Sequence, residues 1–272
     1  MKTDTVTSQD GTIISYQTTG SGPAVIVVPG VLSHAADYAA FAAALGKNFT
    51  VHTIERRGRG ESGAQGSDYS IATECEDVRA LQAKTRAQYI FGHSFGGLVS
   101  LEAARNNASF KKVAVYEPGV SVDGSLTVAW AGDYQKLLDQ NKRLDAFVDF
   151  SLAMGPTAAQ KTPRWLMKMM MPMVVGRKNL KAKLEMLESN LREHTALAAL
   201  DNTYPHYREI SAPVLLMAGG KSGLAWVSPM IKRLQEVLPQ SRVQEFPKLN
   251  HFGPDHTGPA EVATAVSEFF TA

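Results

Sequence analysis

The sequence contains a single cysteine, Cys75, among its 272 residues, so no disulfide can form within the chain. Long hydrophobic runs are also missing, because no stretch approaches the ~20 apolar residues that a membrane-spanning helix needs. Residues 1–11 are polar and lack the apolar segment of a signal peptide. We therefore expect a cytoplasmic protein with no stable insertion into a membrane.

An excess of one charge is absent too, since 28 Lys and Arg face 26 Asp and Glu and the formal net charge is +2. A balance this close to neutral predicts no nucleic acid partner. His, Cys and Asp do not cluster at the spacing of metal ligands, so we expect neither a metal nor an organic cofactor. The composition, 44% hydrophobic and 20% charged, is that of a globular protein with a full core.

Short apolar segments rich in β-branched residues alternate with helical segments over much of the chain. Strands are expected at 12–18, 24–28, 50–54, 89–91, 113–116, 213–217 and 242–246. Helices are expected at 35–45, 71–84, 95–106, 226–237 and 259–270. Such alternation predicts an α/β fold, a mostly parallel eight-stranded sheet with helices on both faces.

The alternation stops between residues 120 and 209, where helical patterns occur without a convincing strand. This segment is therefore expected to be an inserted helical cap. The core domain would then consist of residues 1–119 and 210–272, with the cap at 120–209.

One motif carries the chemistry of a nucleophile. It has the form G-x-S-x-G and reads Gly92-His93-Ser94-Phe95-Gly96. The motif follows an apolar strand and opens a helix, as a nucleophile elbow requires. The tight turn would expose the Ser94 hydroxyl and aim the Phe95 N–H at a developing oxyanion. The alternative is a glycine-rich turn with a passive serine.

Around this motif the chain resembles the α/β-hydrolase superfamily over nearly its whole length. The segment 28–32, Val-Pro-Gly-Val-Leu, is similar to the family's oxyanion loop. The resemblance implies that the Val31 N–H is the second oxyanion donor, with Leu32 as the fallback. Residues 55–62 are similar to the family's D-x-R-G-x-G-x-S turn, which implies a structural role for Arg57.

The segment 249–253, Leu-Asn-His-Phe-Gly, resembles the family's histidine loop. The resemblance implies that His251 is the general base that takes the Ser94 proton and later gives it to the leaving group. His256 lies on the same loop and is the serious rival.

The acid of a triad is harder to place. Where most of the family carry an aspartate after the seventh strand, this chain reads Gly219-Gly220-Lys221-Ser222, and a serine cannot stabilise an imidazolium by charge. Glu117 follows the sixth strand, 23 residues after Ser94. Haloalkane dehalogenases and certain lactonases resemble the chain in placing their acid there, which implies that Glu117 orients His251. The alternatives are Asp255, no carboxylate at all, or a merely structural Glu117.

The predicted cap contains a methionine-rich segment, 165–175, and methionine adapts to irregular apolar space. One interpretation is a cap face over an apolar pocket. The candidate substrate-binding residues are Leu32, His93, Trp165, Met169 and Met170. The alternatives are packing against the core, or an exposed patch for dimerisation or a membrane surface. Four basic residues flank the segment and favour the exposed patch, and these residues are Arg164, Lys168, Arg177 and Lys178.

Taken together, the resemblance implies a serine hydrolase of the esterase or lactonase type that cleaves a carboxylic ester or lactone through an acyl-enzyme on Ser94. The expected partner is a small apolar ester, and a homodimer is left open. On the same fold, a carbon–carbon bond hydrolase and a cofactor-free haloperoxidase are alternatives. From another class, the chain could be a binding protein that has lost turnover.

Overall fold

A computed structural model describes residues 2–272, which form one eight-stranded sheet. The strands are β1 (Lys2–Thr7), β2 (Ile13–Gly20), β3 (Ala24–Val28), β4 (Thr50–Ile54), β5 (Tyr89–His93), β6 (Lys112–Tyr116), β7 (Val214–Gly219) and β8 (Ser241–Phe246). Their order is β1-β2-β4-β3-β5-β6-β7-β8. The β1–β2 and β2–β4 pairs are antiparallel, and the other neighbours are parallel. The predicted fold class is therefore confirmed.

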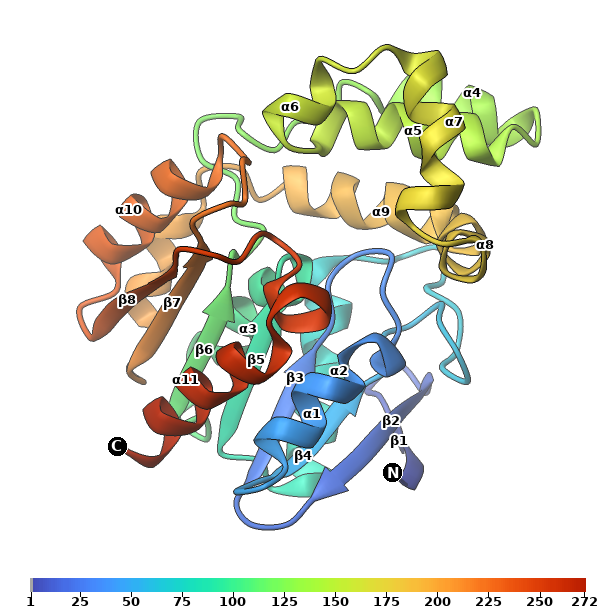
Figure 1. The fold of residues 1–272 in the computed structure, drawn as a ribbon. Coiled ribbons are helices and arrows are strands. Elements are labelled where there is room, and N and C mark those ends of the chain that lie inside the picture. The colour runs from blue at the N-terminus through green and yellow to red at the C-terminus, as the bar shows by residue number, and fades with distance from the viewer. Residues whose placement is uncertain (1) are drawn as a thin grey trace.

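Helices cover both faces of the sheet (Figure 1). On one face lie α1 (Ala39–Leu45) and α11 (Pro259–Thr271), and on the other α2 (Ile71–Thr85), α3 (Phe95–Ala104) and α10 (Val227–Val237). Strand β3 shows why the run 24–28 is apolar at every position. Val25 and Val27 pack in the first layer and Ile26 and Val28 in the second, all fully buried.

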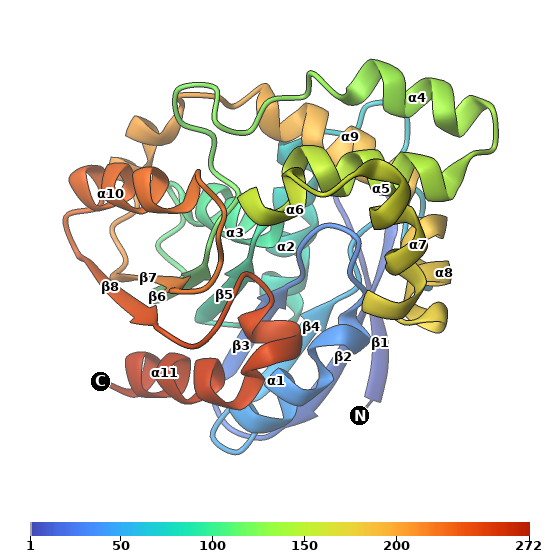
Figure 2. The same cartoon turned by 45° about the horizontal axis from the view of Figure 1, so that its top comes forward.

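A group of helices lies between β6 and β7 in the sequence. It contains α4 (Ala131–Asp139), α5 (Arg143–Met154), α6 (Thr157–Gln160), α7 (Arg164–Val174), α8 (Arg177–Glu185) and α9 (Leu187–Ala198). We call residues 131–198 the helical insertion. Figures 1 and 2 show it over one edge of the sheet, and an apolar cluster of its own holds it together. The division into core and cap domains stays a prediction.

Short helical turns complete the chain, namely η1 (Ala35–Tyr38), η2 (Tyr204–Glu209) and η3 (Gly253–Thr257). Helix α3 ends at Ala104, two residues before the predicted end. Arg105 is extended and Asn106 is left-handed with φ 51°, a conformation that asparagine tolerates. Within residues 2–272, no helix has both the length and the apolar character to cross a membrane.

Helix α3 approaches the end of β3 without an intervening side chain. A Cβ added at Gly96 would lie 2.1 Å from the Val28 carbonyl oxygen and 2.5 Å from that of Pro29. Both obstacles are backbone atoms, which cannot swing aside as a side chain can. Replacement of Gly96 must therefore move the helix or the strand.

We expect Gly96→Ala to lower the free energy of unfolding by at least about 3 kcal/mol, because overpacking outweighs the better helix propensity of alanine. Gly132→Ala in α4 is the matched control, since a Cβ there meets nothing within 4 Å. It should leave stability unchanged or raise it by up to about 1 kcal/mol. Urea unfolding measures both, and equal stabilities would contradict the close contact at Gly96.

Candidate active site

Ser94 occupies the turn between β5 and α3 in a strained conformation, with φ 54° and ψ −122°. Its N–H donates to the Tyr116 carbonyl (3.0 Å), and its own carbonyl accepts from the N–H groups of Gly97 and Gly119 (both 2.8 Å). A serine adopts a positive φ only where its surroundings hold it there. These bonds fix the turn and present the side chain at the carboxyl edge of the sheet.

The two predicted oxyanion donors lie on either side of Ser94. A Cβ added at Gly30 would be 3.2 Å from the Ser94 Cβ, so the loop that carries Val31 runs directly past the serine. Within residues 2–272, neither the Val31 N–H nor the Phe95 N–H has a hydrogen-bond acceptor. The Phe95 N–H is also the first of helix α3, where backbone donors point outward. Two free donors beside a hydroxyl suit an anion that forms there.

Glu117 is completely buried, and its carboxylate accepts three hydrogen bonds. His251 Nδ1 lies 2.6 Å from Oε2, Ser222 Oγ donates to the same oxygen (2.8 Å), and the Gly219 N–H donates to Oε1 (2.8 Å). A buried carboxylate is stable only when such donors replace water. The structure therefore brings the carboxylate of Glu117 to His251.

Ser222 is a contact that sequence reasoning missed. A serine cannot replace an aspartate at this position, but the Ser222 hydroxyl supports the carboxylate that reaches His251 from the neighbouring strand. The signal was available, because a hydroxyl placed where an acid is absent can donate to an acid nearby.

The rival residues on the histidine loop are not brought to the same place. The Asp255 carboxyl makes no hydrogen bond to His251 in the part of the chain that the structure describes, and its Oδ1 is buried without a partner. Burial raises the pKa of Asp255 from 3.8 to about 6. His256 is exposed.

A chain of hydrogen bonds behind the elbow links three loops. The Gly30 N–H donates to the Tyr38 hydroxyl (3.1 Å), which lies 2.6 Å from His93 Nδ1, and His93 Nε2 lies 2.8 Å from the His251 carbonyl. Since a carbonyl only accepts, Nε2 carries the proton and Nδ1 accepts from Tyr38. Burial holds the pKa of His93 well below its usual value, which keeps this neutral tautomer. Tyr38 was not found by sequence reasoning.

Buried charges connect the floor of the site to the helical insertion. Arg56 pairs with Glu74 (2.9 Å) and with Glu193 of α9 (3.1 Å), and Arg59 pairs with Glu193 (2.7 Å). All four side chains are almost fully buried. Arg56 also donates to the Gly30 carbonyl (3.1 Å), so the cluster supports the loop that passes Ser94.

Arg57 has the structural contacts that the sequence implies. Its guanidinium donates twice to Asp77 (2.7 Å each) and once to Asp10 (2.9 Å). These bonds tie the turn after β4 to α2 and to the β1–β2 connection. None of them involves Ser94 or His251.

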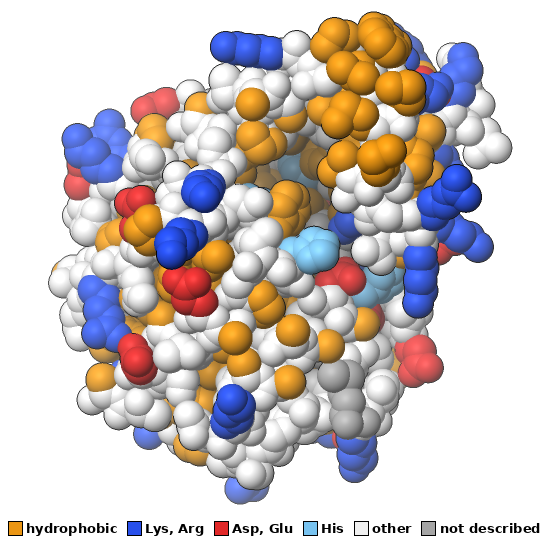
Figure 3. Space-filling view, in the orientation of Figure 1, with side chains coloured by type: hydrophobic (Ala, Val, Ile, Leu, Met, Phe, Trp, Pro, Cys, Tyr) orange, Lys and Arg blue, Asp and Glu red, His pale blue; other side chains and the backbone are white. Residues whose placement is uncertain are grey.

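The predicted substrate-binding residues have different surroundings. Leu32 is buried among side chains of the helical insertion. His93 has both ring nitrogens engaged within the protein, and its contact with substrate stays a prediction. Trp165, Met169 and Met170 are 68%, 65% and 39% exposed, and their place in a pocket stays a prediction. Figure 3 shows a hollow between the helical insertion and the core.

Within the described residues, no group of three or more His, Cys, Asp or Glu side chains could hold a metal ion. That the protein needs neither a metal nor an organic cofactor stays a prediction.

The chain is similar to known proteins in sequence and in structure. A model described as "Alpha/beta hydrolase family" matches residues 25–265. The chain is 32% identical over 110 residues to an N-formylmaleamate deformylase of Pseudomonas putida. That alignment covers 39% of this chain and spans only 41% of the relative.

Two solved structures are similar over almost the whole chain. An alpha/beta hydrolase from Sphaerobacter thermophilus has a TM-score of 0.82 and 29% identity, over 98% of this chain and 100% of that one. An enol-lactonase from Burkholderia xenovorans has a TM-score of 0.77 and 19% identity, over 99% and 100% of the two chains. At 19% identity the second likeness shows the fold alone.

The raised pKa of Asp255 predicts that the free energy of unfolding depends on pH. Between about pH 4 and 6 the unfolded chain releases this proton before the folded chain does, so the folded state loses stability as the pH rises. Asp255→Asn removes that loss. We expect the variant to gain about 1–3 kcal/mol in the free energy of unfolding at pH 8, and a gain that shrinks toward zero below about pH 4.

Urea unfolding at pH 8 and pH 4.5 measures the effect. Asp68→Asn, at an exposed position, is the control and should change stability by less than about 0.5 kcal/mol at either pH. A pH-independent effect of Asp255→Asn would contradict the raised pKa.

Proposed function

The chain belongs to the alpha/beta hydrolase family, and on this premise we propose that it is a serine hydrolase that cleaves a carboxylic ester or lactone through an acyl-enzyme on Ser94. The observation that carries the proposal is the 2.6 Å contact between His251 Nδ1 and the buried carboxylate of Glu117. Because Nδ1 donates to the carboxylate, Nε2 is left as the basic nitrogen. A histidine in this tautomer is the partner that a nucleophilic serine needs.

In the first half of the reaction, the Ser94 hydroxyl adds to the carbonyl carbon as its proton passes to His251 Nε2. The carbonyl oxygen becomes an oxyanion, which the N–H groups of Val31 and Phe95 stabilise. Each such donor is typically worth about 3–4 kcal/mol of the barrier. The bond to the alcohol oxygen then breaks, and the alcohol leaves with the proton from His251.

In the second half, water replaces the alcohol. His251 Nε2 takes a proton from the water as its oxygen adds to the acyl carbon, and the tetrahedral oxyanion forms again. When the bond to Ser94 breaks, His251 returns the proton to the serine and the carboxylic acid is released. Glu117 stabilises the imidazolium in both halves, and Ser222 and Gly219 hold Glu117 in place.

The helical insertion is proposed as the cap of the substrate pocket. Its cluster includes Leu32, which directly follows the proposed donor Val31. Glu193 on α9 is paired to both arginines of the buried charge cluster.

A second candidate reaction is hydrolysis of an N-formyl group, which the similarity to N-formylmaleamate deformylase favours. The same steps apply, with the formyl carbon as the electrophile and an amide nitrogen as the leaving group. The two reactions are distinguished by turnover of p-nitrophenyl esters against release of formate from an N-formyl imide.

We expect wild-type protein to hydrolyse p-nitrophenyl esters of short to medium acyl chains and Ser94→Ala to be inactive. Glu117→Gln should lower kcat by about 10³–10⁴-fold, because an amide cannot stabilise the imidazolium by charge. Asp255→Asn makes the same chemical change on the histidine loop and should keep kcat within about threefold, as it makes no bond to His251.

The opposite ranking of the two carboxyl variants would make Asp255 the acid. A wild-type protein that is inert to esters and N-formyl imides but still reacts with a fluorophosphonate probe would favour a carbon–carbon bond hydrolase or a haloperoxidase. A protein inert to the probe as well would favour a binding protein.

The position of Ser222 allows a test in which the carboxylate is moved from residue 117 to residue 222. In Glu117→Gln/Ser222→Asp the carboxylate returns to the turn after β7, beside the same histidine. We expect this double variant to have at least about tenfold higher kcat than Glu117→Gln, since a restored charge recovers part of the lost stabilisation. Ser222→Ala alone should lower kcat by about tenfold with KM unchanged, because a hydrogen bond to the carboxylate is lost. Equal activity of the double variant and Glu117→Gln would contradict a shared position for the two side chains.

A further inference from the structure

Helix α7 exposes an apolar stripe on the outside of the helical insertion. The α7 stripe consists of Trp165 (68% exposed), Met169 (65%), Met170 (39%), Met173 (86%) and Val174 (70%). At about 100° per residue, these five side chains cover about half of the helix circumference. Met167 and Met171 face the other way and pack within the helical insertion. Helices of globular proteins normally show the reverse pattern, with polar residues outside.

Basic residues surround the α7 stripe. Residues 150–184 contain seven Lys and Arg and no Asp or Glu, in a chain whose totals are 28 and 26. Within the described chain, Asp145 and Asp149 neutralise Arg164 and Lys168. The remaining exposed cations include Arg177, Lys178 and Lys181 on α8.

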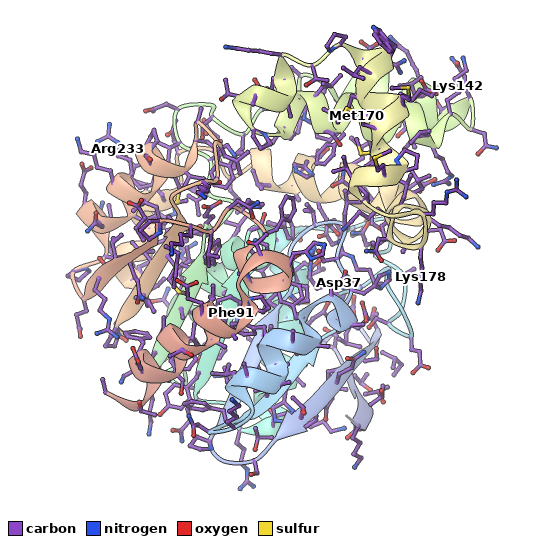
Figure 4. The ribbon with its side chains drawn as sticks, in the orientation of Figure 1. Asp37, Phe91, Lys142, Met170, Lys178 and Arg233 are labelled. Atoms are coloured by element: carbon purple, nitrogen blue, oxygen red, sulfur yellow. The ribbon has the colours of Figure 1, made fainter. Side chains whose placement is uncertain are left out.

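Figure 4 labels Met170 and Lys178 on the neighbouring helices of the helical insertion, and Figure 3 shows the apolar surface bordered by basic side chains.

We propose that the α7 stripe and its basic border dock the protein on an anionic lipid surface, with α7 lying in the plane of the interface. Exposed Trp and Met side chains enter the headgroup and acyl boundary, and lysine and arginine beside them attract anionic headgroups. A helix of 11 residues is too short to span the hydrocarbon core, so binding is peripheral.

A second copy of the chain fits this surface less well than lipid does. A two-fold interface through α7 would place the basic border of one protomer against that of its partner, and like charges repel. One helix of three turns also offers less than the ~800 Å² per partner of a stable interface.

Docking through the α7 stripe would bring the hollow beside it close to the lipid. Figure 3 shows the apolar surface bordering the hollow between the helical insertion and the core. A docked protein would therefore open this hollow close to the lipid, where apolar molecules concentrate. The docking itself does not depend on any reaction at Ser94.

The test is co-sedimentation of the full chain with vesicles of phosphatidylcholine alone or with phosphatidylglycerol at about 30 mol%. We expect binding to the anionic vesicles, weak binding to the neutral ones, and loss of binding as salt is raised from 0.05 to 0.5 M, because salt screens the basic border. Equal binding to both kinds of vesicle, or none to either, would overturn the proposal.

Two variants locate the binding surface. Trp165→Ser/Met169→Ser/Met173→Ser should abolish binding, and Arg177→Gln/Lys178→Gln should lower the partition coefficient by about 25-fold, since each cation contributes about fivefold. The control is Ile13→Ser/Val243→Ser, which removes exposed apolar side chains (45% and 40%) from the sheet and should bind as wild type. Unchanged binding of the two α7 and α8 variants, or loss in the control, would overturn the assignment.

Sedimentation velocity without vesicles measures whether the chain is a monomer or a dimer. A monomer at micromolar concentration supports docking on lipid. A dimer that the triple serine variant dissociates would show that a second copy covers the stripe, and this would overturn the proposal.

Discussion

The backbone of helix α3 touches the carboxyl end of β3 at Gly96, and the geometry of the site depends on that contact. No side chain separates the two elements, since an added Cβ would lie 2.1 Å from the Val28 carbonyl oxygen. The loop that leaves β3 and the first turn of α3 are therefore neighbours, and the proposed donors Val31 and Phe95 come one from each. The same approach forces the turn at Ser94 to be tight. Hydrogen bonds to Tyr116 and Gly119 then hold a conformation that a serine would otherwise avoid.

The carboxylate beside His251 can come from either of two strands because β6 and β7 are adjacent and parallel. Tyr116 pairs with Met217, and the Glu117 N–H donates to the Met217 carbonyl (2.8 Å), so the residues that follow the two strands start from nearly the same point. Moving the acid from the turn after β7 to Glu117 leaves the histidine where it was. Ser222, in the turn without an acid, then acts as a donor to the carboxylate.

Much of the fold and of the candidate site could be predicted because the evidence is local. The elbow is a five-residue pattern between a strand and a helix. Glu117 directly follows the predicted strand 113–116, and His251 lies in the loop after the predicted strand 242–246. Tyr38 and Ser222 belong to no such local pattern, although a hydroxyl at position 222 is compatible with a contact to a nearby acid. Their roles depend on which loops the sheet order brings together. The methionines of α7 are a different case, because composition does not tell which side of an inserted helix faces outward.

The buried charges around Glu193 limit which helical insertions could replace the one in this protein. Glu193 belongs to the helical insertion, whereas Arg56 and Arg59 lie in the turn after β4 and Glu74 lies in α2. An insertion taken from another hydrolase would have to supply a carboxylate at that point, or else leave two positive charges facing one negative charge away from water. Arg56 in turn donates to the Gly30 carbonyl of the loop that passes Ser94, so a mismatch would reach the reacting atoms. A change at Glu193 in α9 therefore has to be matched by a change in the turn after β4.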